Sequence, residues 1–568
     1  MKNIPTSDLH HALILCRMAF FSAAGFSLVI NLLQLVPTIY MLQLYDRVVP
    51  TGNLSTLLML TLIVMVLFLT MGILEWVRSQ ILVRVSTRLE TLLNERLFQV
   101  AYKQSLYTGG QRAGSQPLDD LTALRQFLTG QGLFAFFDAP WMPIYIAVMF
   151  VFHVWYGWAA IATAIVLIII AIINEKLTSK LLDEANGLAI TGRNLVNKNL
   201  KNAEVIESMG MLHSVRNRWI EGTRQILILQ ATASSRAGLM SALSKLIRLS
   251  SQSLILALGA YLVIENEITA GLMIAGSILL GRVLAPIDIM IGSWKGFINA
   301  RGQYKRLNHI LLQIPDDTEK MTLPVPQGEF KIEAATVVPP GSKVPVIKGI
   351  SLTIEKGEVV GVLGPSGAGK STFARALLGI WPTTNGKIRL DGADVFAWNR
   401  HELGPFIGYL PQDIELFEGT ISENISRFGE IDPEKVVNAA KMADVHELIL
   451  RLPNGYDTYI GADGGALSGG QRQRIGLARA LYGDPVVVVL DEPNSNLDEQ
   501  GELALGNAIQ RLKQKSVTVV VITHRSNVLV HVTKLLILND GLVSLYGPRE
   551  QVIAQLQQQL VKPQSMAS

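Results

Sequence analysis

Cysteine is almost absent from this chain of 568 residues, which contains only Cys16. One thiol cannot form an intrachain disulfide, and it cannot build a zinc site that needs several cysteines. Cys16 stands beside an apolar run, which favours a role as a small apolar residue near a membrane segment. The sequence therefore excludes both a disulfide framework and a cysteine-rich metal site.

Net charge is also small, at +4 for the whole chain. Proteins that hold nucleic acids through phosphate contacts usually carry a large positive charge or a strongly basic face. We therefore expect no nucleic-acid partner.

Long apolar runs fill residues 1 to about 300, whereas the remainder has the composition of a soluble protein. The first run, from Met18 to about Leu42, is longer than a signal-peptide core and is expected to remain as a helix. A spanning helix needs ~20 apolar residues. The six predicted spans cover about 18–42, 54–75, 134–155, 157–173, 249–264 and 271–291, with a turn at Tyr156-Gly157 between the third and fourth.

The loops between these spans differ in their content of Lys and Arg. The loops at 42–54, 156–157 and 265–270 have few cations, whereas segments 76–133 and 174–240 are rich in them. The positive-inside rule places these two segments and both termini in the cytoplasm. The cations counted are Arg78, Arg84, Arg88, Arg96, Lys103 and Arg112 in the first segment, and Lys176, Lys180, Arg193, Lys198, Lys201, Arg216 and Arg218 in the second.

Both cytoplasmic segments are predicted to be helices that extend the spans into water. Leu89, Leu93 and Leu97 belong to an apolar stripe with helical spacing. Each segment contains a break, at 108–117 and at 205–211, so each is expected to form a helical hairpin suited to contact a soluble domain. Plain loops are the alternative, but structureless loops of about sixty residues are uncommon.

Three cations, Lys245, Arg248 and Arg282, lie in or beside the last two predicted spans. Charge inside a bilayer is costly, so such residues face a bundle interior or a water-filled path, or extend to the interface. We favour the interface for Lys245. For Arg282 the two alternatives are nearly even, with a position along a path slightly favoured and Asp288 as its candidate partner.

A glycine-rich loop organises the second half of the chain. It follows the apolar run 359–363 and precedes a helical pattern, which is the order required by a phosphate-binding loop. Backbone N–H groups would surround phosphates, Lys370 would reach the β- and γ-phosphates of ATP, and the Ser371 hydroxyl would hold Mg²⁺. A chance glycine turn is disfavoured by the complete motif. The residues of the loop are Gly364, Pro365, Ser366, Gly367, Ala368, Gly369, Lys370, Ser371 and Thr372.

Two consecutive carboxylates follow a second buried strand at 486–490. The carboxyl end of a parallel strand would bring Asp491 to the Mg²⁺ of the phosphate loop and direct Glu492 toward an attacking water. We therefore assign Asp491 to the metal and Glu492 to the general base.

A third motif, Leu467-Ser-Gly-Gly-Gln471, precedes a helical pattern, and its Ser468 and glycine N–H groups are suited to a γ-phosphate. With it, nearly the whole chain resembles the ATP-binding cassette exporters. The resemblance rests on six motifs in the order of that family: 364–372, Gln412, 467–471, 486–492, 495–498 and His524.

The resemblance implies an all-α six-helix transmembrane domain fused to an α/β P-loop ATP-binding cassette domain. The boundaries are predicted at 1–300 for the membrane domain, 301–328 for a linker and 329–568 for the cassette. A single copy of each motif implies a homodimer in which ATP is shared with the signature of the opposite subunit. The resemblance also implies that Gln412 and His524 act beside Glu492 in catalysis and that Gln412 contacts the metal. It implies nucleotide contacts from Ser468, Gly469, Gly470, Gln471 and Asp498.

Two positions depart from the pattern of the family. The aromatic residue that usually stacks on adenine is missing near Pro339, and the glutamate before the signature aligns with Ala462, beside Asp463. Nucleotide selectivity and the contact of this loop with the membrane helices are therefore left open.

Within the family, the chain is most similar to bacterial type I secretion exporters of the metalloprotease and lipase secretion group. The segments that carry this similarity are 41–48, 137–143, 203–211 and 337–341. This group implies export of an unfolded protein with a C-terminal signal across the inner membrane, through a periplasmic membrane-fusion adaptor and an outer-membrane channel. The alternative is an exporter of a small molecule, lipid or peptide. A soluble ATPase of the chromosome-maintenance type is disfavoured by the six apolar spans.

Some related exporters begin with a cysteine peptidase that removes a leader from the substrate. Only about 17 residues precede the first predicted span here, too few to fold such a domain. We therefore expect the substrate to leave unclipped.

Overall fold

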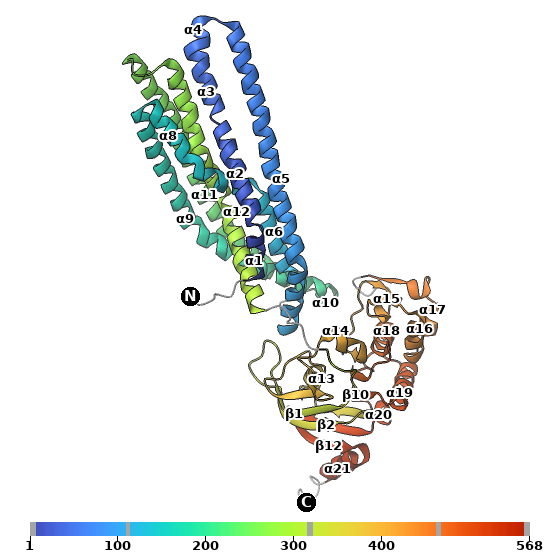
Figure 1. Cartoon of the computed structure of the whole chain (residues 1–568). Helices are drawn as coiled ribbons and strands as arrows, with labels where there is room; N and C mark the ends of the chain where they lie inside the picture. Colours follow the sequence, from blue (N-terminus) through green and yellow to red (C-terminus); the bar gives the residue numbers. More distant parts are fainter. Residues whose placement is uncertain (1–6, 110–113, 315–321, 462–466, 562–568) are drawn as a thin grey trace, which may run out of the picture. The chain divides into compact units, whose positions relative to one another are not determined.

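The computed structural model describes residues 7–109, 114–314, 322–461 and 467–561. The chain forms two compact units, coloured along the sequence in Figure 1. The helical unit comprises Met1–Lys103 with Gly114–Asp316, and the sheet unit comprises Gln104–Ala113 with Asp317–Ser568. The helix that crosses residue 300 continues to Gln313, and part of the predicted linker, 315–321, lies outside the described residues. The predicted domain boundaries therefore stay predictions.

Six helical segments in the described residues are long and apolar enough to cross a membrane, which confirms the predicted all-α membrane part. They are Arg17–Thr51, Leu54–Tyr107, Gly132–Phe152, Val154–Lys201, Leu212–Ile264 and Ala270–Gln313. The long helices run side by side as a bundle in Figure 1.

The first span is not one continuous helix. It consists of α2 (Arg17–Leu33), α3 (Val36–Gln43), a π-helical turn (Leu44–Val48) and α4 (Val49–Thr51), preceded by α1 (Asp8–Leu15). Pro37 and Pro50 each stand within the first two positions of a new helix, where the missing N–H costs no hydrogen bond.

Two helical hairpins extend from the spans, as predicted. The first joins α5 (Leu54–Tyr107) to α6 (Gln116–Thr129), and the second joins α9 (Val154–Lys201) through α10 (Ala203–Ser208) to α11 (Leu212–Ile264). Leu89, Leu93 and Leu97 are buried against α1, α6 and α12 (Ala270–Gln313). The stripe found in the sequence therefore packs the helical unit together.

The turn predicted at Tyr156-Gly157 is wrong. The third span runs through α7 (Gln131–Asp138), a 3₁₀ turn (Ala139–Trp141) and α8 (Met142–Phe152), and the break falls at the extended His153, whose side chain accepts the N–H of Trp155. Gly157 lies inside α9, where a Cβ atom would come within 2.3 Å of the Phe150 ring. This glycine permits close helix packing and does not form a turn.

The sheet unit is built on a six-stranded sheet in the order β12-β11-β3-β10-β9-β6, in which only β12 is antiparallel to its neighbour. A four-stranded antiparallel sheet, β2-β1-β4-β5, and a β7-β8 pair complete it. The strands are β1 (Phe330–Val337), β2 (Ile347–Ile354), β3 (Val359–Leu363), β4 (Asn385–Leu390), β5 (Ala393–Asp394), β6 (Ile407–Leu410), β7 (Gly419–Thr420), β8 (Tyr459–Ile460), β9 (Val487–Asp491), β10 (Thr518–Ile522), β11 (Lys534–Asn539) and β12 (Leu542–Pro548).

Both faces of the six-stranded sheet are covered. Val487 and Val489 pack into the core that contains Phe373 of α13, whereas Val488 and Leu490 pack into the core beneath α16, α18 and α19. Burial on both faces explains why its central strands are uninterrupted apolar runs. The helices of this unit are α13 (Lys370–Leu377), α14 (Arg400–Leu403), α15 (Ile421–Ile425), α16 (Pro433–Met442), α17 (His446–Leu450), α18 (Gly469–Leu481), α19 (Glu499–Gln514), α20 (Ser526–Leu529) and α21 (Arg549–Val561).

Candidate nucleotide site and a buried polar network

Three neighbouring parallel strands bring the predicted motifs to one edge of the sheet. β10 pairs with β3 on one side and with β9 on the other, and Ile522 lies opposite both Val362 and Asp491. The glycine loop follows β3, Glu492 follows β9, and His524 follows β10. Parallel strands therefore collect three segments that lie far apart in the sequence.

The glycine loop adopts a backbone that needs its glycines. Gly364, Gly367 and Gly369 have φ values of 155°, 82° and 96°. A Cβ atom on Gly364 would come within 2.2 Å of the Leu538 carbonyl oxygen. The loop leads directly into α13, so its backbone N–H groups lie at a helix N-terminus, where phosphates bind.

Lys370 is folded onto this loop. Its Nζ donates hydrogen bonds to the carbonyl oxygens of Gly364 at 2.8 Å and Pro365 at 3.1 Å, and the residue is buried. The ammonium group is thus held where the loop would surround a phosphate.

Asp491 is a fully buried carboxylate at the end of β9. Neither of its carboxyl oxygens has a hydrogen-bond partner of good geometry among the described residues. Burial raises the pKa of Asp491, whereas the neighbouring Ser371 hydroxyl and Arg375 lower it. An orphaned buried carboxylate beside a hydroxyl fits a divalent cation, because a cation would satisfy oxygens that the protein leaves unpaired.

No cluster of three His, Cys, Asp or Glu side chains suited to a metal occurs in the described part of the chain. A site with few protein ligands, Ser371 and Asp491 among them, suits Mg²⁺, which keeps several waters and is commonly completed by substrate phosphates.

Glu492 lies between the other two predicted catalytic side chains, Gln412 and His524. Its Oε2 accepts a hydrogen bond from Nε2 of Gln412 at 2.9 Å, and its Oε1 lies 3.9 Å from Nε2 of His524. Its φ of 49° is in the left-handed region, which is strained for a residue with a Cβ atom. The Glu492 N–H donates to the Ile522 carbonyl at 2.9 Å, so a bond to β10 fixes this backbone.

The signature segment forms a capping box at the start of α18. Ser468 Oγ accepts the N–H of Gln471 at 3.3 Å, and Gln471 Oε1 accepts the N–H of Ser468 at 2.8 Å. In the described residues these side chains have no hydrogen bond to the glycine loop of the same chain. Gly469 and Gly470 lie beside Asn496, within the segment that ends at Asp498.

Asp498 caps α19 by accepting the N–H of Gly501 at 2.9 Å, and it pairs with Arg474 at 2.6 Å. The Gly501 N–H and the Arg474 guanidinium hold the pKa of Asp498 below its ordinary value. Arg474 belongs to α18, so this ion pair ties the segment after Glu492 to the signature helix.

Of the two positions that depart from the family pattern, the structure describes only the one near Pro339. Pro339 lies just after β1 in a turn closed by the Ser342 N–H and the Pro339 carbonyl at 3.0 Å. Ala462 and Asp463 lie outside the described residues.

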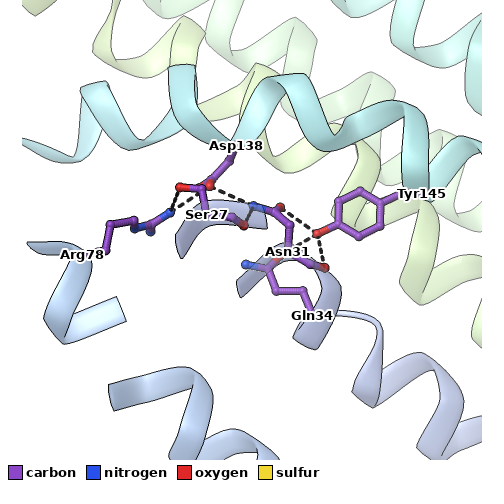
Figure 2. A network of polar contacts seen from close by, with 6 residues as sticks. All are labelled: Ser27, Asn31, Gln34, Arg78, Asp138 and Tyr145. Atoms are coloured by element: carbon purple, nitrogen blue, oxygen red, sulfur yellow. Dashed lines mark hydrogen bonds and ion pairs between the residues drawn. The ribbon is translucent and has the colours of Figure 1, made fainter. Parts of the chain in front are cut away.

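A buried polar network in the helical unit was missed by the sequence patterns (Figure 2). Nη1 of Arg78 on α5 lies 2.8 Å from Oδ1 of Asp138, at the end of α7, and 2.8 Å from Oγ of Ser27. The other members of the network are Asn31, Gln34 and Tyr145.

Asn31 on α2 connects the two ends of this network. Its Nδ2 donates to Oδ1 of Asp138 at 2.9 Å, and its Oδ1 accepts the Tyr145 hydroxyl at 2.7 Å. Arg78 also stacks over the Phe134 ring at 4.5 Å. Arg78, which the sequence placed among the cytoplasmic cations, is therefore a buried link between α2, α5, α7 and α8. A lone Asp inside a predicted span was the one signal available in the sequence.

The candidate pair of Arg282 with Asp288 is wrong. Asp288 pairs with Arg248 at 2.9 Å and accepts the Ser244 hydroxyl at 2.5 Å. Arg282 and Asp288 belong to the same helix and are not spaced by three or four residues, so they do not share a face. The pair links α11 to α12.

Comparison with known proteins covers both units. Residues 347–495 match the model described as ABC transporter, and residues 20–287 match the model of the ABC transporter transmembrane region. The chain is 42% identical over 546 residues to the type I secretion system ATP-binding protein PrsD of Rhizobium meliloti, covering 95% of this chain and 93% of that protein.

More distant relatives share the same organisation. The alpha-hemolysin translocation ATP-binding protein of Escherichia coli is 27% identical, over 96% of this chain and 78% of that protein. A solved structure of a bacterial Atm1-family ABC exporter with ATP bound matches with a TM-score of 0.82 at 21% identity, covering 97% of this chain and 98% of that one. The last match shows that the fold is shared.

Proposed function

Since this chain belongs to the ABC transporter family, we propose that it is the ATP-driven exporter of a type I secretion system and moves unfolded proteins with C-terminal signals across the bacterial inner membrane. The observation that carries this proposal is the 42% identity with a type I secretion protein over 95% of the chain. The similarity to a hemolysin translocation protein supports the same substrate class. The chain is a multi-pass membrane protein that binds and hydrolyses ATP.

The contacts around Glu492 support the proposed catalytic roles. Its carboxylate serves as the general base that orients water, and Gln412 and His524 hold that carboxylate from two sides. Mg²⁺, when bound with ATP, offsets the charge that develops on the phosphates. Asp491 and Ser371 would hold the cation, and Gln412, which donates to Glu492, would contribute a further contact. Lys370 and the loop N–H groups hold the phosphates.

A homodimer would complete each ATP site. The hydrogen bonds of Ser468 and Gln471 are made within their own capping box, and none joins them to the glycine loop among the described residues. The signature N-terminus is thus available to a second copy of the chain. Shared sites make hydrolysis depend on dimer closure, which can be coupled to movement of the membrane helices.

A periplasmic membrane-fusion adaptor and an outer-membrane channel are the proposed partners, because an inner-membrane exporter alone would release its substrate into the periplasm. An exporter of a small molecule, lipid or peptide with the same ATPase is the alternative. No specific contact among the described residues favours this alternative.

The test is secretion in a host that lacks its own type I system and carries this chain with the adaptor and channel of its source genome. Candidate proteins from that genome would be expressed intact and without their C-terminal segment. We expect export only of the intact protein, and none with Glu492→Gln. Export that continues without the C-terminal segment would contradict the proposed signal.

A further inference from the structure

A groove at one end of the helical unit lies between the start of α2 and the middle of α5. It encloses a cavity of about 310 Å³. Its walls are Leu15, Cys16, Met18, Ala19 and Ser22 on one side, and Ile81, Arg84, Val85 and Arg88 on the other. Apolar side chains thus form most of the surface, with two guanidinium groups at its border.

The two arginines stand out from others on the same helix. Arg78 and Arg96 are buried and paired with Asp138 and Asp8, at 2.8 Å and 2.9 Å. Arg84 and Arg88 are exposed, and neither has a hydrogen bond or ion pair in the described residues. Their spacing of four residues places them on one face of α5, so both can approach a single anion.

The depth of this groove in the membrane follows from helix geometry. Roughly 30 residues separate Leu54, the first residue of α5, from Arg84, which is about 45 Å of helix. A bilayer with its headgroups is about 40–45 Å thick, so Arg84 reaches the headgroup layer on the cytoplasmic side. Met18 and Phe21 on the neighbouring α2 are 68% and 71% exposed, as expected for side chains that face lipid.

The two walls are ordered along the membrane normal. On α5, which runs toward the cytoplasm here, Ile81 lies closer to the bilayer centre than Arg88. On the other wall, Ser22 lies closer to the centre than Cys16, because Cys16 precedes α2 and α2 runs into the membrane. The cationic end of the groove therefore faces the headgroups, and its apolar end faces the acyl chains.

We propose that this groove binds an anionic phospholipid of the cytoplasmic leaflet, with the phosphate on Arg84 and Arg88 and an acyl chain along Ala19, Ser22 and Ile81. Arginine is suited to phosphate because its planar donors make paired hydrogen bonds. An inorganic phosphate would use the arginines but leave the apolar wall uncovered. The ligand would hold α2 and α5 together at the membrane border.

The test is native mass spectrometry of the full-length protein in detergent, titrated with phosphatidylglycerol or phosphatidylcholine. We expect phosphatidylglycerol to bind in preference, and Arg84→Gln with Arg88→Gln to weaken its binding about tenfold, because two charge-assisted contacts are lost. The matched control is Lys176→Gln with Lys180→Gln, another exposed pair spaced by four residues, on α9. This control should change the affinity less than about twofold.

A second variant, Ala19→Trp, fills the groove and keeps both arginines. It should also lose the lipid, and Arg84→Lys with Arg88→Lys should bind more tightly than the glutamine variant but less tightly than the parental protein, because lysine keeps the charge and lacks the paired donors. Equal losses in Arg84→Gln with Arg88→Gln and in the control Lys176→Gln with Lys180→Gln would overturn the proposal, since the lipid would then respond to net charge alone. Binding of inorganic phosphate as tight as that of phosphatidylglycerol, or unchanged binding in Ala19→Trp, would overturn it as well.

Discussion

The ATP site and the polar network of Figure 2 both hold charged groups away from water, but they are assembled differently. The ATP site depends on short contiguous motifs placed at the ends of β3, β9 and β10. The network depends on single residues from α2, α5, α7 and α8, with Arg78 and Asp138 sixty positions apart.

This difference concerns which groups make the bonds. In the glycine loop, backbone N–H groups are the proposed binding groups, and the φ angles of the loop require glycines at a fixed spacing that is visible in the sequence. In the network, each bond involves at least one side chain and most bonds join two side chains, so no contiguous motif is required. Mutations should therefore affect chemistry in the first region and stability in the second.

The largest expected effect is on hydrolysis in Glu492→Gln. Loss of the general base should lower the ATPase rate by about 100-fold or more while ATP binding is retained. Purified protein assayed for phosphate release and for nucleotide affinity would measure both. Glu550→Gln, an exposed change on α21, is the control; a parental rate in Glu492→Gln would refute the assignment.

Mutations in the polar network should lower the stability of the folded protein. Arg78→Leu leaves the Asp138 carboxylate without its counter-charge, and we expect a loss of about 3 kcal/mol in folding free energy. Arg78→Leu with Asp138→Leu removes both charges and should recover much of that loss. Thermal unfolding in detergent compares them, with the exposed Arg218→Leu as control. If the double variant is less stable than the single one, the ion pair is not what holds these helices.

Lys370→Ala tests the glycine loop with a smaller effect. The lost ammonium leaves phosphate charge poorly compensated, so ATP affinity should fall about tenfold. Binding of a fluorescent ATP analogue would measure it, and the exposed Lys387→Ala on β4 should match the parental protein. Unchanged affinity in Lys370→Ala would remove the role assigned to its side chain.

The smallest effect concerns the shared sites. A dimer of one Lys370→Ala chain and one Ser468→Arg chain has one intact composite site and one doubly damaged site, whereas each homodimer has two damaged sites. Doubly tagged heterodimers should recover up to about half of the parental ATPase rate if the sites act independently. Complete inactivity of proven heterodimers would contradict independent shared sites.

The sequence by itself determined the elements whose physical requirement is local. Uninterrupted apolar runs predicted both the spans and the buried strands. A run of ~20 apolar residues is stable as a helix in a bilayer, and a short apolar run is stable as a strand that is buried on both faces of a sheet. The glycine spacing predicted the phosphate loop, and the carboxylates after Leu490 predicted the residues that the sheet places near it.

The tertiary structure decided the features that depend on which helix faces pack together. The break falls at His153, and Gly157 lies inside α9, where the absence of a side chain leaves room for Phe150. The partner of Asp288 is Arg248 on another helix, because helix periodicity turns Arg282 to a different face. Arg78 looked like its cytoplasmic neighbours in the sequence, and only the approach of α7 buries it beside Asp138, where a paired charge is stable.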